Sequence, residues 1–162
     1  FDPDQAANVL SEWRPILDLA PTIIKDHAKD LEVASWYIEA LIRFQGRKSG
    51  KEFETPVAYT KFGDEILICL TETRNRQWWR NYREPWPMRF KHKNRWLEGE
   101  ARWLEPASAE YRDNFERVFR HVSFTPRIYK IYDFDPKQGL TDAQLQILLD
   151  NSSGIVQLML RT

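Results

Sequence analysis

The chain has 162 residues, of which 42% are hydrophobic and 30% charged, and its formal net charge is zero. This length suffices for one domain with its own core, and the balance is typical of globular rather than disordered proteins. No apolar run approaches the roughly 20 residues that a helix needs to cross a bilayer, so we expect no membrane segment. Cys69 is the only cysteine, which excludes an intrachain disulfide and fits a reducing, cytoplasmic location.

The charges are distributed unevenly. Residues 40–51 carry four basic and no acidic side chains, and residues 72–103 carry nine basic against four acidic ones. A basic middle segment favours an anionic ligand. The chain has 14% aromatic residues, which favours either an aromatic core or a pocket for a planar molecule. The three histidines are far apart and there is no second cysteine, so no local metal site is expected.

The segment from Gly46 to Pro56 is the first candidate site. Two glycines bracket Arg47, Lys48 and Ser49, and glycine permits backbone amides to converge on one anion. The cations and the hydroxyl would complete a phosphate site. The alternative interpretation is a solvated turn between two elements. The spacing differs from that of a P-loop, which also follows a strand rather than a helix.

The predicted elements begin with helices in the first forty residues, starting at the Asp2–Gln5 cap and near Pro21. Apolar residues at helical spacing from Leu31 predict a helix that ends at Phe44. Strands are predicted over residues 55–61 and 65–70, and the second is apolar on both faces and therefore central.

A helix is predicted over residues 74–83, followed by a β-hairpin over residues 88–103 that turns at Lys93–Arg95. Ser108 caps the next helix, and a short helix follows from Thr125 to about Tyr132, where the alternation of residues leaves a strand as the alternative. Residues 141–144 form a capping box for the last helix, and residues 155–160 form a final strand.

With these motifs the chain resembles the deazaflavin-dependent nitroreductase family of the FMN-binding split β-barrel superfamily. The likeness rests on Gly46–Gly50 with Thr55-Pro56, on Trp78-Trp79-Arg80-Asn81-Tyr82 and on the strand after Pro87, and covers roughly residues 36–105. The resemblance implies an α+β, mainly antiparallel split β-barrel with N-terminal, inserted and C-terminal helices. We expect a single domain over residues 1–162, in which the helical segment 1–44 packs on the barrel of residues 45–162, and a homodimer.

The resemblance also implies a flavin or deazaflavin cofactor, FMN being one candidate. Its phosphate would contact the basic turn, Thr55 and Pro56 would flank its ring, Trp78 would lie against it, and Thr71 and Thr73 would wrap its tail. The expected cofactor-binding residues are Arg47, Lys48, Ser49, Gly50, Lys51, Thr55, Pro56, Thr71, Thr73, Trp78 and Trp79. Glu52 and Glu54 depart from the family pattern, because family members usually carry a basic residue there.

The leading function is hydride transfer from the reduced cofactor to a small organic acceptor such as a nitroaromatic or a quinone. No catalytic acid or base can be nominated. One alternative is a protein that binds a flavin, haem or another planar anion without turnover, or that has lost its cofactor. Binding of nucleic acid through the basic segment is a third class, which zero net charge and the lack of a motif disfavour.

Overall fold

The computed structural model describes residues 40–161, so the predicted N-terminal helices lie outside the described residues. The described elements are β1 (Ala40–Gln45), β2 (Glu52–Val57), β3 (Tyr59–Phe62), β4 (Glu65–Leu70), the 3-10 turns η2 (Thr73–Asn75) and η3 (Trp78–Tyr82), β5 (Trp86–His92), β6 (Arg95–Trp103), α4 (Ala109–His121), α5 (Thr125–Ile128), α6 (Asp142–Asp150) and β7 (Gly154–Leu160). All pairings are antiparallel, and the seven strands form one sheet in the order β2-β1-β5-β6-β7-β4-β3.

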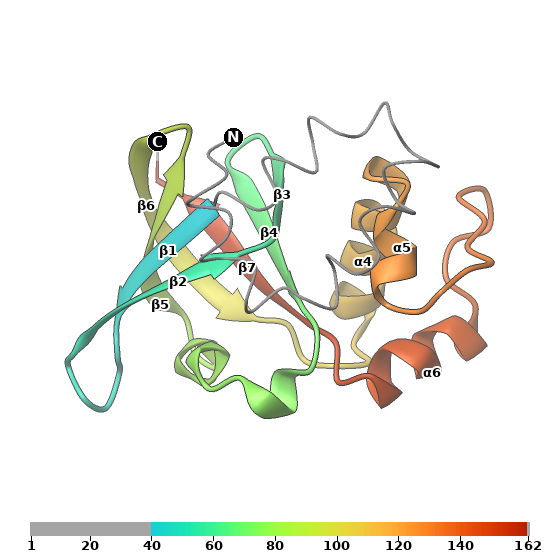
Figure 1. The fold of residues 1–162 in the computed structure, drawn as a ribbon, viewed down its shortest axis with the longest axis horizontal. Helices are drawn as coiled ribbons and strands as arrows, with labels where there is room; N and C mark the ends of the chain where they lie inside the picture. The colour runs from blue at the N-terminus through green and yellow to red at the C-terminus, as the bar shows by residue number, and fades with distance from the viewer. Residues whose placement is uncertain (1–39, 162) are drawn as a thin grey trace, which may run out of the picture.

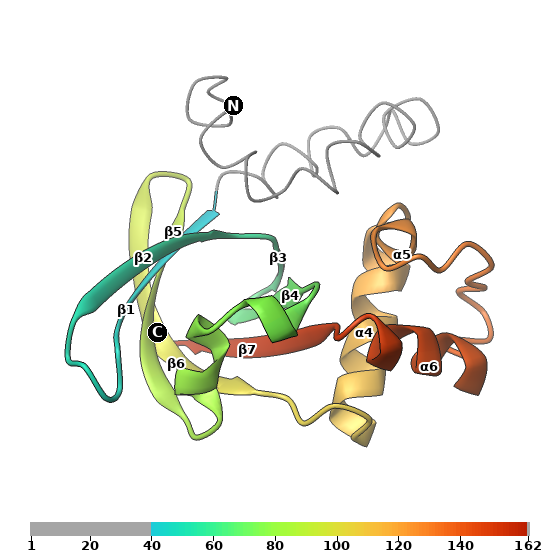
Figure 2. The same cartoon turned by 60° about the horizontal axis from the view of Figure 1, so that its bottom comes forward.

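The sheet is curled because its two edge strands are consecutive in the chain. β2 and β3 lie at opposite edges of the sheet but are separated in sequence only by Ala58. A single bent segment therefore runs from one edge to the other, as Figures 1 and 2 show. This arrangement, with helices gathered at one end of the sheet, is an α+β split barrel. The predicted fold class is confirmed.

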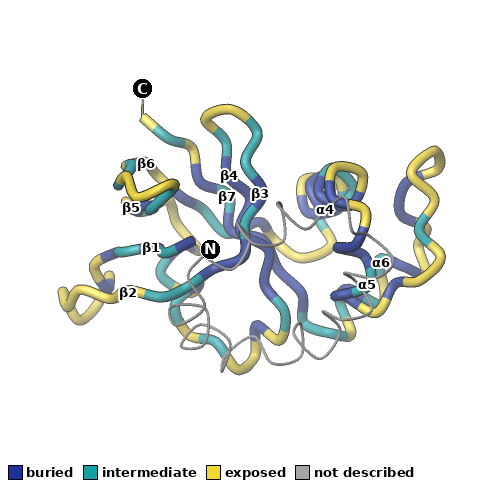
Figure 3. The backbone as a smooth tube through the Cα atoms, turned by 45° about the horizontal axis from the view of Figure 1, so that its top comes forward, coloured by how far each residue is buried: buried dark blue, intermediate teal, exposed yellow. Residues whose placement is uncertain are grey.

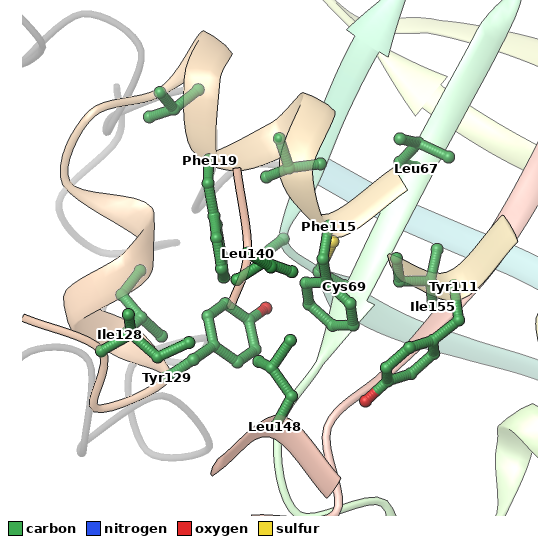
Figure 4. Close-up of a cluster of buried hydrophobic side chains, with 14 of the residues drawn as sticks. Leu67, Cys69, Tyr111, Phe115, Phe119, Ile128, Tyr129, Leu140, Leu148 and Ile155 are labelled. Carbon is green, nitrogen blue, oxygen red and sulfur yellow. The ribbon is translucent and has the colours of Figure 1, made fainter. Parts of the chain in front are cut away.

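Two hydrophobic clusters lie on the two faces of the sheet. Inside the curl, Ile42, Met88, Phe90 and their neighbours form one cluster. The other lies between the sheet and the helices, where Phe115 and Phe119 of α4 approach Tyr129 and Leu148 (Figure 4).

Strand β4 supplies both clusters. Ile66, Ile68 and Leu70 face the interior of the curl, and Leu67 and Cys69 face the helices. The prediction of a central strand covered on both sides is confirmed, and Figure 3 shows the contrast with the exposed β1–β2 turn.

The helix predicted to end at Phe44 is wrong over residues 40–44, which form strand β1. Ala40, Ile42 and Phe44 are buried and alternate with half-buried Leu41 and Arg43. The apolar residues of this segment fit the spacing of a helix as well as the alternation of a strand. Pairing with β2 and β5 favours the strand. The predicted strand over residues 55–61 is likewise two strands, which meet at Ala58.

The predicted helix over residues 74–83 is replaced by η2 and η3, because Arg76 between them is extended with φ −118° and ψ 137°. The helix predicted from Thr125 to about Tyr132 is also shorter and ends at Ile128. The long hairpin, the Ser108 cap of α4, the capping box of α6 and the final strand are confirmed.

Candidate cofactor-binding site

The turn between β1 and β2 is closed by its own backbone. The amide of Gly46 donates to the carbonyl of Lys51 over 2.7 Å, and the amide of Gly50 donates to the carbonyl of Gly46 over 2.9 Å. Gly50 adopts φ 69°, which favours glycine. A Cβ at Gly46 would lie 2.5 Å from the Ser49 hydroxyl oxygen. Glycine is therefore favoured at both positions, and the exposed tip presents Lys48, Ser49 and Lys51 to solvent.

Arg47 points away from this tip and is bound by the protein. Its Nε donates to the carbonyl of Asn81 over 3.1 Å, and its Nη2 donates to the carbonyls of Glu84 and Pro85 over 2.8 and 3.0 Å. Its guanidinium also lies 4.3 Å from the ring centroid of Trp86. These contacts hold the Arg47 guanidinium away from the tip of the turn, where Lys48 and Lys51 are exposed.

Aromatic side chains lie at the base of the turn. The Phe44 ring stacks on Phe53 at a centroid distance of 5.6 Å and contacts Trp78 at 6.1 Å. Phe53 is 45% exposed and Trp78 half-buried, so both present apolar surface outside the core. The structure thus brings the basic turn and Trp78 together. A cationic turn beside an aromatic wall fits the chemistry of a planar anionic cofactor.

Thr55 and Pro56 are half-buried on β2, where Thr55 is opposite Ile42. Strand alternation puts Thr55 on the same face as Phe53, and Glu52 and Glu54 on the opposite face.

On that opposite face both acids pair with one arginine. Arg43 Nη2 and Nε donate to Glu54 Oε2 over 2.8 and 3.0 Å, and Arg43 Nε lies 3.7 Å from Glu52 Oε1. The departure from the family pattern therefore places two acids on the face opposite Phe53, where Glu52 also lines a cavity beside the turn.

Thr71, Thr73 and Trp79 lie in a different environment. The indole Nε1 of Trp79 donates to the carbonyl of buried Thr73 over 2.8 Å, and its ring stacks on Trp103 at 4.3 Å. Thr71 is half-buried and lines a cavity that contains none of the turn residues. In the described part of the chain, no hydrogen bond or ion pair joins Thr71 or Thr73 to the basic turn, whereas Trp79 belongs to the same hydrophobic cluster as Phe44 and Trp78. The cofactor role of all three residues stays a prediction.

A cavity of about 380 Å³ opens beside the turn, and Gly50 is among its lining residues. Arg43, Arg89 and Arg161 line it, with the acids Glu52 and Glu98. The Nε of Arg89 is buried without a hydrogen-bond partner in the described residues, and the Glu98 carboxylate lies 4.0 Å away. An orphaned guanidinium donor in a basic cavity fits an anionic group.

Asn81 and Tyr82 are not among the expected cofactor-binding residues, although they belong to the quoted tryptophan motif. The Asn81 side chain accepts from the Arg47 amide over 2.8 Å. The Tyr82 hydroxyl donates to the carbonyl of Pro87 over 3.1 Å, and burial raises its pKa although Arg47 opposes the shift. Tyr82 therefore stays protonated and anchors the segment. The Trp-x-x-Asn spacing was the available signal.

The described residues contain no group of three or more His, Cys, Asp and Glu side chains placed to hold a metal ion. Within the same part of the chain, no helix has both the length and the apolar composition for a membrane span.

The family model of F420H(2)-dependent quinone reductase matches residues 29–148. The chain belongs to this family. The match extends beyond the predicted residues 36–105 and confirms a family of deazaflavin-dependent reductases. Membership of this family associates the chain with proteins that bind a flavin or deazaflavin or use one for reduction. A second model, the N-terminal region of ImpA from the type VI secretion system, matches residues 2–53, which lie mostly outside the described residues.

No protein of curated function matches the chain significantly. Solved structures that match include an FAD and heme binding protein from Mycobacterium smegmatis, with 12% identity and a TM-score of 0.41, over 75% of this chain and 60% of that one. A NimC/NimA family protein from Clostridium acetobutylicum matches at 11% identity and a TM-score of 0.43, over 88% of this chain and 85% of that one. An F420 reductase matches at 12% identity and a TM-score of 0.39, over 76% and 86%. The chain thus spans less than two thirds of the first of these proteins.

Proposed function

We propose that this family member is a flavin- or deazaflavin-dependent reductase that transfers hydride from a bound reduced cofactor to a small organic acceptor, such as a quinone or a nitroaromatic. The observation that carries the proposal is the meeting of the Gly46–Lys51 turn with the aromatic cluster of Phe44, Phe53 and Trp78, beside a basic cavity. Phosphate and planar ring are the two parts that such a site would hold.

In this proposal Lys48, Ser49 and Lys51 hold the phosphate, because their donors are exposed at the tip of the turn. Phe53 and Trp78 would contact the ring and exclude water from one side of it. The bound cofactor would supply the hydride chemistry, and the chain would position it. We assign no proton-transfer residue.

The experiment is a titration of the full chain with F420 and, separately, FMN, followed by cofactor fluorescence. Lys48→Glu reverses one charge at the turn and should weaken binding about tenfold or more, since hydrogen bonds to charged groups are worth about 1.5–3 kcal/mol. Lys137→Glu makes the same change in an exposed loop and should leave affinity unchanged. Equal affinity of the two variants would contradict the phosphate assignment.

One observation favours a second candidate, a member of the family that has lost its cofactor or binds it without turnover. Arg47 donates to three backbone carbonyls, so its guanidinium is held away from the tip that would bind a phosphate. Oxidation of bound reduced cofactor by menadione or a nitroaromatic separates the candidates. Turnover supports the reductase, binding without turnover supports the binder, and no binding of either cofactor supports loss.

We also propose that residues 1–162 form one domain and that the protein is a homodimer. Light scattering coupled to size-exclusion chromatography tests the assembly, and a monomer at micromolar concentration would contradict it.

A further inference from the structure

The cavity beside the basic turn is larger than a phosphate group requires. Its volume of about 380 Å³ lies within the range of small-molecule sites, and Gly50 of the turn is part of its wall. Glu52 also lines it, whereas Phe53 points to the other face of β2, because side chains alternate along a strand. The cavity and the aromatic cluster therefore lie on opposite sides of the β1–β2 hairpin, and the turn lies at the end of this hairpin.

Positive charges are crowded on the strands that form the cavity. Arg43 of β1 and Arg89 of β5 are directly opposite each other, and both lie over the ring of Trp96. Their guanidinium carbons are 4.4 and 5.3 Å from the ring centroid, and the ammonium nitrogen of Lys91 is 5.8 Å from it. Like charges directly opposite each other on neighbouring strands are destabilising. This arrangement therefore favours the binding of an anion.

Arg89 and Arg161 keep donors for such an anion. The amide of Arg161 donates to the Glu98 carbonyl over 2.9 Å, and Glu98 is opposite Arg89, so the two arginines flank one residue. Arg89 approaches the Glu98 carboxylate only to 4.0 Å, and within residues 40–161 neither arginine side chain donates a hydrogen bond. Both residues line the cavity and are accessible to solvent. A guanidinium group can bind a carboxylate or a phosphate through two hydrogen bonds.

Two glutamates also line the cavity but do not cancel its charge. Glu52 and Glu98 stand against three arginines in the wall. The side chains of these acids are 63% and 66% exposed, compared with 31% for Arg43 and 42% for Arg89. Solvent screens the more exposed charges more strongly, so the cavity keeps a positive potential.

We propose that this cavity binds a second anionic group of the cofactor, which follows the phosphate at the turn, and that Arg89 and Arg161 bind this group. The inference rests on the proposed function, in which the turn holds the phosphate and Phe53 and Trp78 contact the ring. The cofactor would then extend from the aromatic cluster over the turn to the opposite face of β2.

The shared chemistry of the ligand is a negative charge beyond the first phosphate. In F420 this charge is a carboxylate of the tail, and in FAD it is a second phosphate. FMN ends at its single phosphate and would leave the cavity empty of an anion. The site should therefore select cofactors with a second anionic group against FMN.

The test is a fluorescence titration of the full chain with F420, FAD and FMN. Wild type should bind F420 or FAD about tenfold more tightly than FMN, since a hydrogen bond to a charged group is worth about that factor. Arg89→Gln should weaken binding of the preferred cofactor about tenfold and change FMN binding less than about twofold. Preference for F420 identifies a carboxylate, and preference for FAD identifies a second phosphate. Lys48→Glu, in contrast, should weaken all three.

Arg95→Gln is the matched control, because Arg95 is an exposed arginine of the same β5–β6 hairpin and does not line the cavity. It should leave all three affinities unchanged. Arg161→Gln changes an exposed side chain after the last strand, so it tests the site without a change inside the sheet. It should act in the same direction as Arg89→Gln, and thermal melting should show that both variants are folded.

The outcomes separate this site from the proposed function. Wild type that binds FMN as tightly as F420 and FAD would overturn the second-anion site and leave the proposed function standing. Equal effects of Arg89→Gln and Arg161→Gln on all three cofactors would do the same. Failure of all three cofactors to bind wild type would overturn the proposed function together with the site.

Discussion

The backbone amide of Arg47 donates to Oδ1 of Asn81 over 2.8 Å and joins residues that are 34 positions apart in sequence. The same side chain donates through Nδ2 to the carbonyl of Trp78 over 2.8 Å. Asn81 therefore fixes both the basic turn and the 3-10 turn that carries Trp78. An asparagine supplies an acceptor and a donor together, which explains why the Trp-x-x-Asn spacing accompanies the glycine-bracketed turn.

Asn81→Ala removes both bonds and should lower the free energy of unfolding by about 1–2 kcal/mol, because each hydrogen bond contributes about 1 kcal/mol. Cofactor affinity should fall with it, since the turn loses its attachment. Urea denaturation and the fluorescence titration measure the two effects. Asn75→Ala, on an exposed side chain of η2, should change stability by less than about 0.5 kcal/mol. Equal stability of the two variants would contradict the bridging role.

Gly154→Ala tests the close packing at the start of β7. An added Cβ would lie 2.0 Å from Cη2 of Trp103, whose ring stacks on Trp79 at 4.3 Å. We expect a loss of about 1–3 kcal/mol and a changed near-UV circular dichroism spectrum, because the indole pair must move. Gly63→Ala is the control: its Cβ meets no atom within 4 Å, so only its φ of 64° is strained, and the spectrum should stay the same. An unchanged spectrum in Gly154→Ala would mean that the stack does not depend on this glycine.

The ionised carboxylate of Glu65 should stabilise the folded protein at neutral pH, and this stabilisation should be lost in acid. Burial acts to raise its pKa, but hydrogen bonds from Arg117 and Gln157, each 2.8 Å long, and the Arg117 charge outweigh burial, so the pKa lies below its ordinary value. This stabilisation is present above the unfolded-state pKa and is lost as the pH falls through the folded-state pKa. The free energy of unfolding of wild type should therefore exceed that of Glu65→Gln near pH 7, and the difference should shrink toward pH 3. A difference independent of pH would refute the linkage.

The sequence predicted best where one signal was local and unambiguous. The β5–β6 hairpin alternates over its whole length, and Ser108 and Thr141 are caps whose bonds need only neighbouring residues. Prediction failed where distant partners decide. Residues 40–44 fit helical spacing, yet their hydrogen bonds go to β2 and β5.

The same reason applies to the site. The glycines of the turn predicted its exposed tip. They could not predict where the Arg47 side chain points, because the carbonyl groups to which it donates lie 34–38 positions later in the sequence. The environment of Trp79 was equally hidden, because its ring stacks on Trp103, which lies outside the tryptophan motif.

Cys69 should be inert in the folded protein. It lies on the helix-facing side of β4, is 2% exposed, and burial raises the pKa of its thiol to about 12 despite a hydrogen bond with Tyr129. At pH 8 the thiolate fraction is then about a thousandfold lower than for a free cysteine with a pKa of about 8.5. A thiol-reactive disulfide should therefore label Cys69 of the native protein at least about a thousandfold more slowly than a free cysteine. In guanidinium, where the protein is unfolded, labelling should go to completion.

The temperature dependence of the labelling rate gives a second readout. Labelling of Cys69 requires the core between β4 and α4 to open, so the rate should fall steeply as the protein is cooled below its melting temperature. Rapid labelling of native protein at pH 8 would contradict the buried placement. It would also reopen a nucleophilic role for the thiol, which the apolar surroundings of Cys69 argue against.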